Sequence, residues 1–207
     1  MNLGIISSLL KFHPWVYPMK KLTTNELIAK KLPLETFKKQ KRNPIYVILN
    51  NIRSLQNVGL IFRLSDALLI EKLYLCGTTG YPPIKNDTRR PGVVEHAKHE
   101  IEKTAIRTID YVPWEYQENT IQAINQLKKR GIKIVALEQT DKSRDYRKID
   151  WKFPLALVLG HEREGIEDEV LKLADHVAEI PIFGMGNSLN VATSLAIVGY
   201  HLLEKII

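Results

Sequence analysis

The sequence has few of the residues that build covalent or metal-bound frameworks. Cys76 is the only cysteine among 207 residues, so no disulfide can form within the chain. The six histidines are scattered without the spacing of metal ligands, and we therefore expect no bound metal. A protein without disulfides is typical of a reducing compartment, and the cytoplasm is the expected location.

Long apolar runs are also missing. Residues 2–10 form an apolar stretch that is soon followed by Pro14, and no basic residue precedes it. A helix that crosses a bilayer needs roughly 20 apolar residues, and a signal peptide needs a basic start. We therefore expect no membrane partner and no signal peptide.

Several common catalytic and nucleotide-binding motifs are incomplete. The His-Glu pair at residues 161–162 begins like a zinc-protease motif, but Gly165 occupies the position of the second histidine. Gly-Met-Gly at residues 184–186 begins like a dinucleotide-binding loop, but Leu189 stands where the third glycine belongs. There is no Gly-x-x-x-x-Gly-Lys loop either. These absences favour a protein that uses neither a metal nor a nucleoside triphosphate.

Positive charge is concentrated at the start of the chain. Residues 1–42 contain nine Lys and Arg and two Asp and Glu, whereas the remaining residues contain 21 of each sign. Such a field suits a polyanion, either a nucleic acid or an anionic surface, although a solvated lysine-rich helix has the same composition. The main carriers are Lys20, Lys21, Lys30, Lys31, Lys38, Lys39, Lys41 and Arg42.

The chain divides into an appendage and one main domain. Thr23 and Glu26 have the spacing of a helix capping box, which predicts a basic helix that breaks near Pro33 and resumes through Lys41. Because Met19 opens a run typical of a natural start, we expect residues 1–18 to be a dispensable extension. Residues 19–42 then form a basic helical leader, and residues 43–207 form the main domain.

The main domain alternates between two kinds of segment. Apolar runs of strand length are typical of strands that are buried on both faces. Segments with helical periodicity separate them, which predicts an α/β fold with a mostly parallel sheet and helices on both faces. The strands are expected at residues 45–49, 73–76, 132–137, 155–159 and 177–182, and the helices at 59–70, 118–130, 168–174 and 189–206. The Gly-, Pro- and charge-rich residues 78–104 are expected to form a long surface loop.

Polar and glycine-rich segments follow four of these strands. They are residues 50–57, 138–140, 160–165 and 183–190. In open parallel sheets, ligands bind beyond the carboxyl ends of the strands. The pattern therefore predicts one binding site at this edge without naming its ligand.

Three residue patterns at this edge have both a functional and a structural interpretation. Arg63 follows Asn57 by six residues in an otherwise apolar helix, so it needs an anion, either a bound phosphate or an acid such as Glu162. The turn at residues 160–165 either faces a ligand, with Glu162 or Glu164 binding a polar group or Arg63, or caps the following helix. Ser188 is a good helix N-cap, and Asn190 in a buried first turn needs a polar partner.

Together and in this order, the segments resemble the three motifs of the SpoU (TrmH) branch of the SPOUT methyltransferases. The first is residues 50–59 and continues to Arg63, the second is residues 157–165, and the third is Ile180-Pro181 followed by residues 188–191. The resemblance implies a C-terminal trefoil knot, a homodimer in which each site is completed near the partner subunit, and S-adenosylmethionine as cofactor. The helices that begin near Asn57 and Leu189 are the expected interface.

The resemblance also implies an activity and roles for residues. The expected reaction is methylation of a ribose 2′-hydroxyl of RNA. Arg63 would position the target phosphate and hydroxyl and assist electrostatically, since a guanidinium keeps its proton, while RNA phosphate or water accepts the hydroxyl proton. Asn57 would orient the reacting groups and Glu162 would position Arg63 or the nucleotide. The methyl-donor and hydroxyl sites would be shaped by Ser188 and Asn190, and the cofactor would be held around Leu137, Gly160, Ile180, Ser188 and Leu189.

The RNA target is less specified than the reaction. The basic leader together with Arg53, Arg89 and Arg90 is expected to contact phosphates, with affinity that falls steeply with salt. Transfer RNA is favoured slightly over ribosomal RNA. The alternatives are a non-catalytic RNA-binding protein on the same fold and a base-directed RNA methyltransferase of the family.

Overall fold

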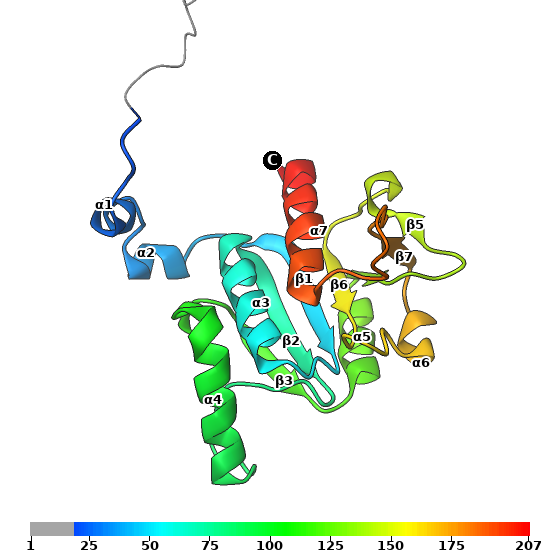
Figure 1. Cartoon of the computed structure of the whole chain (residues 1–207), viewed down its shortest axis with the longest axis horizontal. Helices are drawn as coiled ribbons and strands as arrows, with labels where there is room; N and C mark the ends of the chain where they lie inside the picture. The colour runs from blue at the N-terminus through cyan, green and yellow to red at the C-terminus, as the bar shows by residue number, and fades with distance from the viewer. Residues whose placement is uncertain (1–18) are drawn as a thin grey trace, which may run out of the picture. The chain divides into compact units, whose positions relative to one another are not determined.

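The computed structural model describes residues 19–207, so the expected dispensable extension lies outside the described residues. The chain divides into two compact units, Met1–Gln40 and Lys41–Ile207. Figure 1 shows the ribbon of the second unit as a sheet with helices packed on it.

The described part of the first unit consists of two short helices, α1 (Thr24–Ala29) and α2 (Leu34–Lys38). The predicted capping box is confirmed, because the backbone N–H of Thr23 donates to Glu26 Oε2 at 2.8 Å and that of Glu26 donates to Thr23 Oγ1 at 3.3 Å. The predicted break is confirmed at Pro33, the N-cap of α2, although α2 ends at Lys38 rather than at Lys41. Neither helix has a fully buried residue.

Within the second unit, a parallel sheet of seven strands has the order β3-β2-β1-β6-β4-β7-β5. All six strand pairs are parallel, so every strand ends at the same edge. The strands are β1 (Asn43–Asn50), β2 (Ile70–Cys76), β3 (Trp114–Gln117), β4 (Lys133–Leu137), β5 (Arg144–Asp145), β6 (Leu155–Leu159) and β7 (His176–Glu179).

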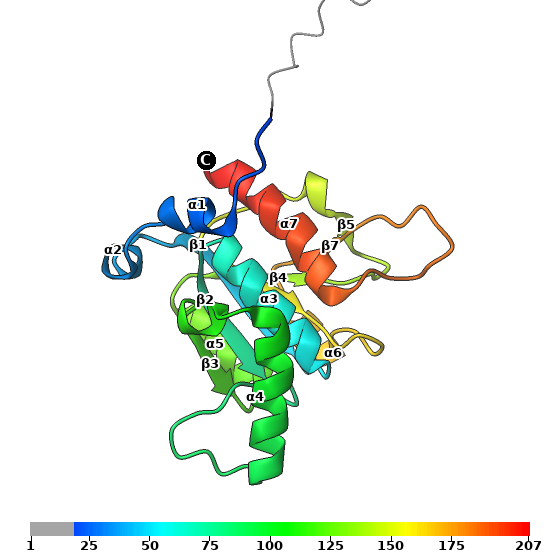
Figure 2. The ribbon, with the colours of Figure 1, turned by 60° about the vertical axis from the view of Figure 1, so that its left-hand side comes forward.

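Side chains of the central strands alternate between two apolar cores, one on each face of the sheet. Ile45, Val47 and Leu49 of β1 belong to the core that packs against α3 (Leu55–Ala67), α4 (Pro91–Ala105) and α7 (Val191–Ile206). Tyr46 and Ile48 belong to the other core, against α5 (Thr120–Lys129) and α6 (Asp168–Leu171). Figure 2 shows α3, α4 and α7 on the near side of the sheet. The predicted doubly covered parallel sheet is therefore confirmed.

The strand predictions are confirmed where the apolar runs are continuous and fail where they are short. β3 and β5 were not predicted, because β3 carries the half-buried Trp-Glu-Tyr-Gln at a sheet end and β5 has only two residues. β7 ends at Glu179, earlier than predicted, and Pro181 beyond it has no N–H for a strand partner. Two short 3₁₀ turns, η1 (Thr108–Asp110) and η2 (Tyr146–Lys148), complete the elements.

The predicted long loop at residues 78–104 is wrong in its second half, which is α4. Pro91 at the first turn suits a helix start, but the buried stripe is only Ala97, Ile101 and Ala105. A stripe with a single large apolar side chain gives a weak hydrophobic signal. The close packing of α4 on α3 centres on Gly59, where a Cβ would collide with the Thr104 hydroxyl and the Ile101 carbonyl.

Candidate active site at the carboxyl edge of the sheet

A pocket of about 470 Å³ opens at the carboxyl edge of the sheet. Its walls come from the ends of β4, β6 and β7, the turn at residues 160–165, and residues 187–191. Three of the four loops expected at this edge therefore line it directly. Residues 53 and 54 of the fourth loop do not line the pocket. Their backbone N–H groups instead donate to the carboxylate of Glu162.

A chain of side-chain hydrogen bonds joins the three motif segments beside this pocket. Asn57 Nδ2 donates to Glu162 Oε1 at 2.9 Å, and Asn190 Nδ2 donates to Asn57 Oδ1 at 2.9 Å. A carboxylate only accepts, so the contact with Glu162 orients the Asn57 amide, and this in turn requires Asn190 to donate. Three residues far apart in sequence thus form one polar unit.

The carboxylate of Glu162 lies at the N-terminus of α3. Its oxygens also accept from the backbone N–H groups of Ser54 at 3.2 Å and Arg53 at 3.3 Å, where a helix dipole favours negative charge. Burial works to raise the pKa of Glu162, but the hydrogen bonds from Asn57 and from backbone N–H groups outweigh it and leave the pKa below its usual value. Glu162 therefore stays ionised and serves as an acceptor.

Asn190, rather than the predicted Ser188, is the N-cap of α7. Asn190 Oδ1 accepts from the backbone N–H groups of Ala192 at 2.9 Å and Thr193 at 3.3 Å. The predicted helix start is therefore two residues early, because the asparagine satisfies these exposed N–H groups in place of the serine. Ser188 is exposed on the wall of the pocket.

The turn at residues 160–165 needs both of its glycines. A Cβ on Gly160 would meet the backbone carbonyl of Gly165, and Gly165 has a φ of +71°, which L side chains rarely adopt. Glu138, at the end of β4, supports the turn because its Oε2 accepts from the backbone N–H of Ile166 at 2.9 Å. Sequence reasoning named the segment that contains Glu138 but gave this carboxylate no role.

All five residues expected around the cofactor line the pocket: Leu137, Gly160, Ile180, Ser188 and Leu189. Of the five expected catalytic residues, Glu162, Ser188 and Asn190 also line it, and Asn57 touches two of them.

Arg63 is the exception. It is exposed on α3, does not line the pocket, and makes no hydrogen bond or ion pair with any residue of 19–207. Of the two interpretations left open for Arg63, pairing with an acid of the same chain, Glu162 or Glu164, is therefore wrong. Arg63 lies six residues after Asn57, which turns it about 240° around the helix axis, away from the Asn57 side.

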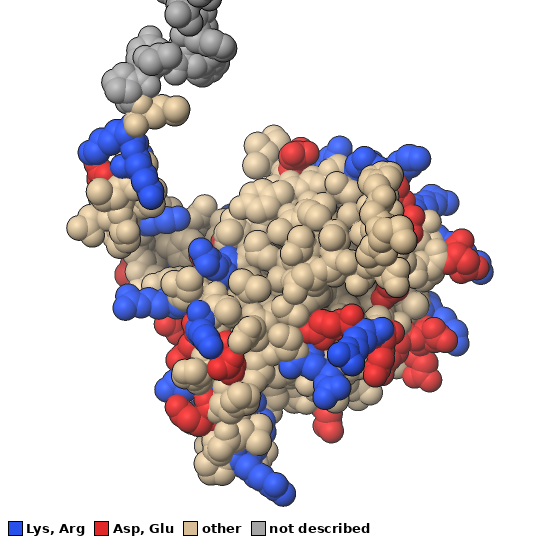
Figure 3. All heavy atoms as spheres, in the orientation of Figure 1, with Lys and Arg blue, Asp and Glu red and all other residues tan. Residues whose placement is uncertain are grey.

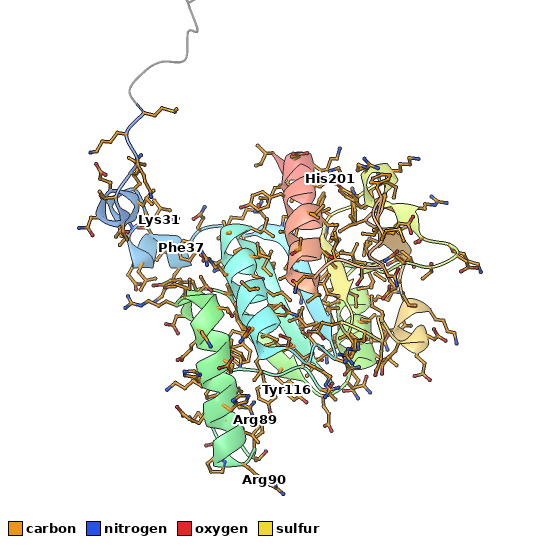
Figure 4. All side chains as sticks on the ribbon, in the orientation of Figure 1. Lys31, Phe37, Arg89, Arg90, Tyr116 and His201 are labelled. Carbon is orange, nitrogen blue, oxygen red and sulfur yellow. The ribbon has the colours of Figure 1, made fainter. Side chains whose placement is uncertain are left out.

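The cations expected to contact RNA fall into two groups. The leader lysines, Arg53 and Arg90 are exposed, and Figure 3 shows the leader densely covered by Lys and Arg. Arg89 is instead held by Asp87 at 2.6 Å and by the carbonyl of Tyr81 at 3.0 Å, so its guanidinium has a structural role. Figure 4 shows Arg89 and Arg90 beside α4. Arg42 is half-buried and donates to the carbonyls of Ile70 at 3.1 Å and Tyr111 at 2.5 Å.

Within residues 19–207, no helix is long and apolar enough to span a bilayer. No group of His, Cys, Asp and Glu side chains in the same range has the arrangement of a metal site.

Comparison with known proteins yields relatives over nearly the same part of the chain. The sequence model of the SpoU rRNA Methylase family matches residues 44–200. The tRNA (guanosine(18)-2′-O)-methyltransferase of Thermus thermophilus is 27% identical over 82% of this chain and 79% of its own length. The enzyme of the same name from Aquifex aeolicus is 30% identical over 78% of this chain and 70% of its own length.

Solved structures agree with these matches. An AdoMet-bound rRNA methyltransferase from Sinorhizobium meliloti superposes with a TM-score of 0.67 at 25% identity over 83% of this chain, which spans 60% of that protein's length. The A. aeolicus TrmH/SpoU tRNA modifying enzyme superposes with a TM-score of 0.65 at 27% identity, covering 83% of this chain and 81% of that one.

Proposed function

Because the chain belongs to the SpoU rRNA Methylase family, we propose that it transfers a methyl group from S-adenosylmethionine to a ribose 2′-hydroxyl of RNA. The observation that carries the proposal is the hydrogen-bonded chain from Asn190 through Asn57 to Glu162, at the wall of a pocket between three strand ends. Two of the most similar relatives bear the name of 2′-O-methyltransferases.

The pocket fits the cofactor in size and chemistry. A volume of about 470 Å³ lies within the range of small-molecule sites. Leu137, Leu159 and Ile180 supply apolar walls suited to an adenine ring, and Gly160, which has no room for a Cβ beside Gly165, keeps the turn at the pocket wall tight. S-adenosylmethionine supplies an electrophilic methyl carbon on a sulfonium. Ser188 and Leu189 complete the pocket near the start of α7, in the positions that the family resemblance gives them.

The residues of the chain then orient and activate the ribose hydroxyl. The hydroxyl oxygen forms a bond to the methyl carbon, the carbon–sulfur bond breaks with its electron pair going to sulfur, and the hydroxyl proton leaves to an RNA phosphate or water. In-line placement is the main requirement of such a transfer. Ser188 and Asn190 shape the hydroxyl site, and Glu162 keeps Asn57 oriented. Arg63 holds the target phosphate and stabilises developing negative charge.

Arg63 acts in this scheme across a homodimer. It is exposed about 120° around the axis of α3 from Asn57 and has no hydrogen-bond or ion-pair partner among residues 19–207. Near it on α3 lie Leu60 and Leu64, and α7 carries the exposed Tyr200. A second copy packed against α3 and α7 covers these apolar side chains and places its own Arg63 at the neighbouring pocket. We also propose that the C-terminal part of the chain forms the trefoil knot that the family resemblance implies.

A mixed dimer tests this arrangement. Subunits carrying Arg63→Ala are combined with subunits carrying Asn190→Ala, and methyl transfer to RNA is measured. If Arg63 serves the partner's pocket, one of the two sites in each mixed dimer is intact and activity returns. If Arg63 serves its own pocket, both sites are defective and the mixture stays inactive, which would overturn the shared site. Methylated RNA digested to nucleosides must contain 2′-O-methylribose; a base-methylated product or no product at all would refute the reaction.

The basic leader is the proposed RNA contact, and the cytoplasm is the proposed location. Transfer RNA is the favoured substrate class because two of the most similar relatives are named for it. Replacing the paired lysines Lys30 and Lys31 with Gln should lower the slope of log affinity against log salt by about 1 per lost phosphate contact. Replacing Lys128 and Lys129 of α5, which are also exposed, is the matched control and should leave the slope unchanged.

A further inference from the structure

The side chain of His161 accepts hydrogen bonds from backbone N–H groups within the turn at residues 160–165. The turn is pinned at its ends by two backbone hydrogen bonds between His161 and Gly165, both 3.0 Å. Within it, His161 Nδ1 lies 3.1 Å from the backbone nitrogen of Arg163 and 3.1 Å from that of Glu164. Both of these groups are donors, so one ring nitrogen accepts two hydrogen bonds.

This geometry assigns the protonation state of the ring. Nδ1 accepts only when it carries no proton, so the neutral ring carries its proton on Nε2. A ring protonated on both nitrogens has no acceptor, and its Nδ1–H would face two backbone N–H donors. Both hydrogen bonds are then lost together, and the donors repel one another.

Glu162 lies in sequence between His161 and the two residues whose backbone N–H groups donate to the histidine ring. Its carboxylate holds Asn57 at 2.9 Å and thereby Asn190, also at 2.9 Å. The rest of the turn has few other side-chain supports, since Gly160 and Gly165 contribute none and Arg163 and Glu164 are exposed. His161, Glu162 and Arg163 all line the pocket. The direction in which Glu162 leaves the turn therefore depends on the ring of His161.

We propose that His161 is a positioning residue for methyl transfer: its Nε2–H tautomer holds the turn that presents Glu162 to Asn57, and protonation of Nδ1 releases that turn. The inference rests on the proposed function, because methyl transfer is its main readout. It adds a residue that acts through Glu162. It also makes acidification a way to lose turnover without loss of the fold.

The charged groups around the ring are present in every variant of the test. The turn itself contributes Glu162, Arg163 and Glu164. From neighbouring elements, Glu138 at the end of β4 and Glu179 at the end of β7 line the same pocket. Their side chains are already engaged, with Ile166 N–H at 2.9 Å and Ser143 Oγ at 2.6 Å. A difference between variants at position 161 is therefore due to the ring.

His161→Asn is the conservative variant, because Asn Oδ1 occupies the position of Nδ1 and accepts without titrating near neutral pH. His161→Leu has similar bulk and no acceptor. The kcat and KM for RNA are measured for wild type and both variants between about pH 8 and pH 5. Wild type should lose kcat on acidification, and His161→Asn should keep kcat within about threefold and lose the acid limb. His161→Leu should lose roughly tenfold or more in kcat at alkaline pH, with little change in cofactor affinity.

Two outcomes would overturn the proposal: full kcat in His161→Leu, or an acid limb in His161→Asn identical to that of wild type. If His161→Leu fails to fold, the nitrogen chemical shifts of the wild-type ring, assigned by comparison with His161→Asn, give a second test. An unprotonated Nδ1 at the active pH supports the proposal and a protonated Nδ1 refutes it. Absence of methyl transfer by wild type at every pH would instead refute the proposed function, and the chemical shifts would still report on the turn.

Discussion

The first turn of α3 and its middle turn differ in what their polar side chains contact. Asn57, in the first turn, is 8% exposed and is held on both sides by hydrogen bonds of 2.9 Å. Arg63, six residues later, is exposed and makes no hydrogen bond or ion pair with any residue of 19–207. The seven residues from Asn57 to Arg63 thus place the Asn57 amide inside a hydrogen-bonded network. They leave the Arg63 guanidinium available to an anion of another molecule.

The difference teaches that spacing along a helix sets direction as well as distance. Residues three or four apart share a face, whereas residues six apart do not. A motif that pairs positions 57 and 63 therefore serves either two separate sites or one site shared between two molecules. The Gly59 side of the same helix is a third face, packed on α4 without room for a Cβ. Substitutions of Arg63, of the network around Asn57 and of Gly59 should therefore have different effects.

The largest expected effect is the loss of kcat on replacement of the exposed Arg63. Arg63→Ala should reduce kcat by roughly 10²- to 10³-fold, because it removes a cation aimed at developing charge. The melting temperature and cofactor affinity should stay near wild type, since the side chain makes no hydrogen bond or ion pair with any residue of 19–207. Methyl transfer to RNA and calorimetry with S-adenosylmethionine measure these quantities. Lys128→Ala, an exposed cation on α5, is the control, and near-normal transfer by Arg63→Ala would remove the basis of the comparison.

The next effect is at the network. Asn190→Asp keeps the oxygen that caps α7 but replaces the donor to Asn57 with an acceptor. It should lower kcat by up to roughly 10²-fold through misplacement, with little loss of stability. Asn190→Ala removes the cap as well and should cost about 1 kcal/mol in free energy of unfolding. Equal stability of the two variants in urea unfolding would show that Asn190 does not act as the cap.

A smaller effect, on stability alone, is expected at the third face. Gly59→Ala should cost about 1–3 kcal/mol in free energy of unfolding, because α4 must move away from α3 to admit the methyl group. Gly92→Ala is the matched control, since a Cβ there meets nothing within 4 Å. Urea unfolding followed by circular dichroism measures both. Equal stability of the two variants would contradict the close approach of the helices.

The smallest effect is the pH dependence that Glu162 contributes. Folding lowers the pKa of Glu162 from its usual value, so its contribution to stability is present above the unfolded pKa and is lost as pH falls through the folded pKa. The difference in unfolding free energy between wild type and Glu162→Gln should therefore shrink as pH falls from about 7 to about 3. A constant difference for Glu162→Gln would mean that the hydrogen bonds do not favour its ionised form.

The success of the sequence predictions followed the strength of each physical signal. The apolar runs at residues 45–49 and 155–159 are central strands, because a strand buried on both faces must be apolar throughout. The edge strand β5 and the helix α4 were missed, because two polar residues and a buried stripe of two alanines and one isoleucine carry little periodic signal. The start of α7 was misplaced because Ser188 and Asn190 cap a helix about equally well, and the observed hydrogen bonds belong to Asn190.

The sequence by itself determined the α/β class, the edge of the sheet where polar loops gather, and the family, since these follow from local patterns of residue type. Only the tertiary structure decided which of those polar side chains meet. It joined Asn57, Glu162 and Asn190 and separated Arg63 from them, because hydrogen-bond partners depend on how helices and turns are rotated about their axes. The residue types of the site could be identified from the sequence. Only the fold shows that the side chains of Asn57, Glu162 and Asn190 are joined by hydrogen bonds and that the side chain of Arg63 is not.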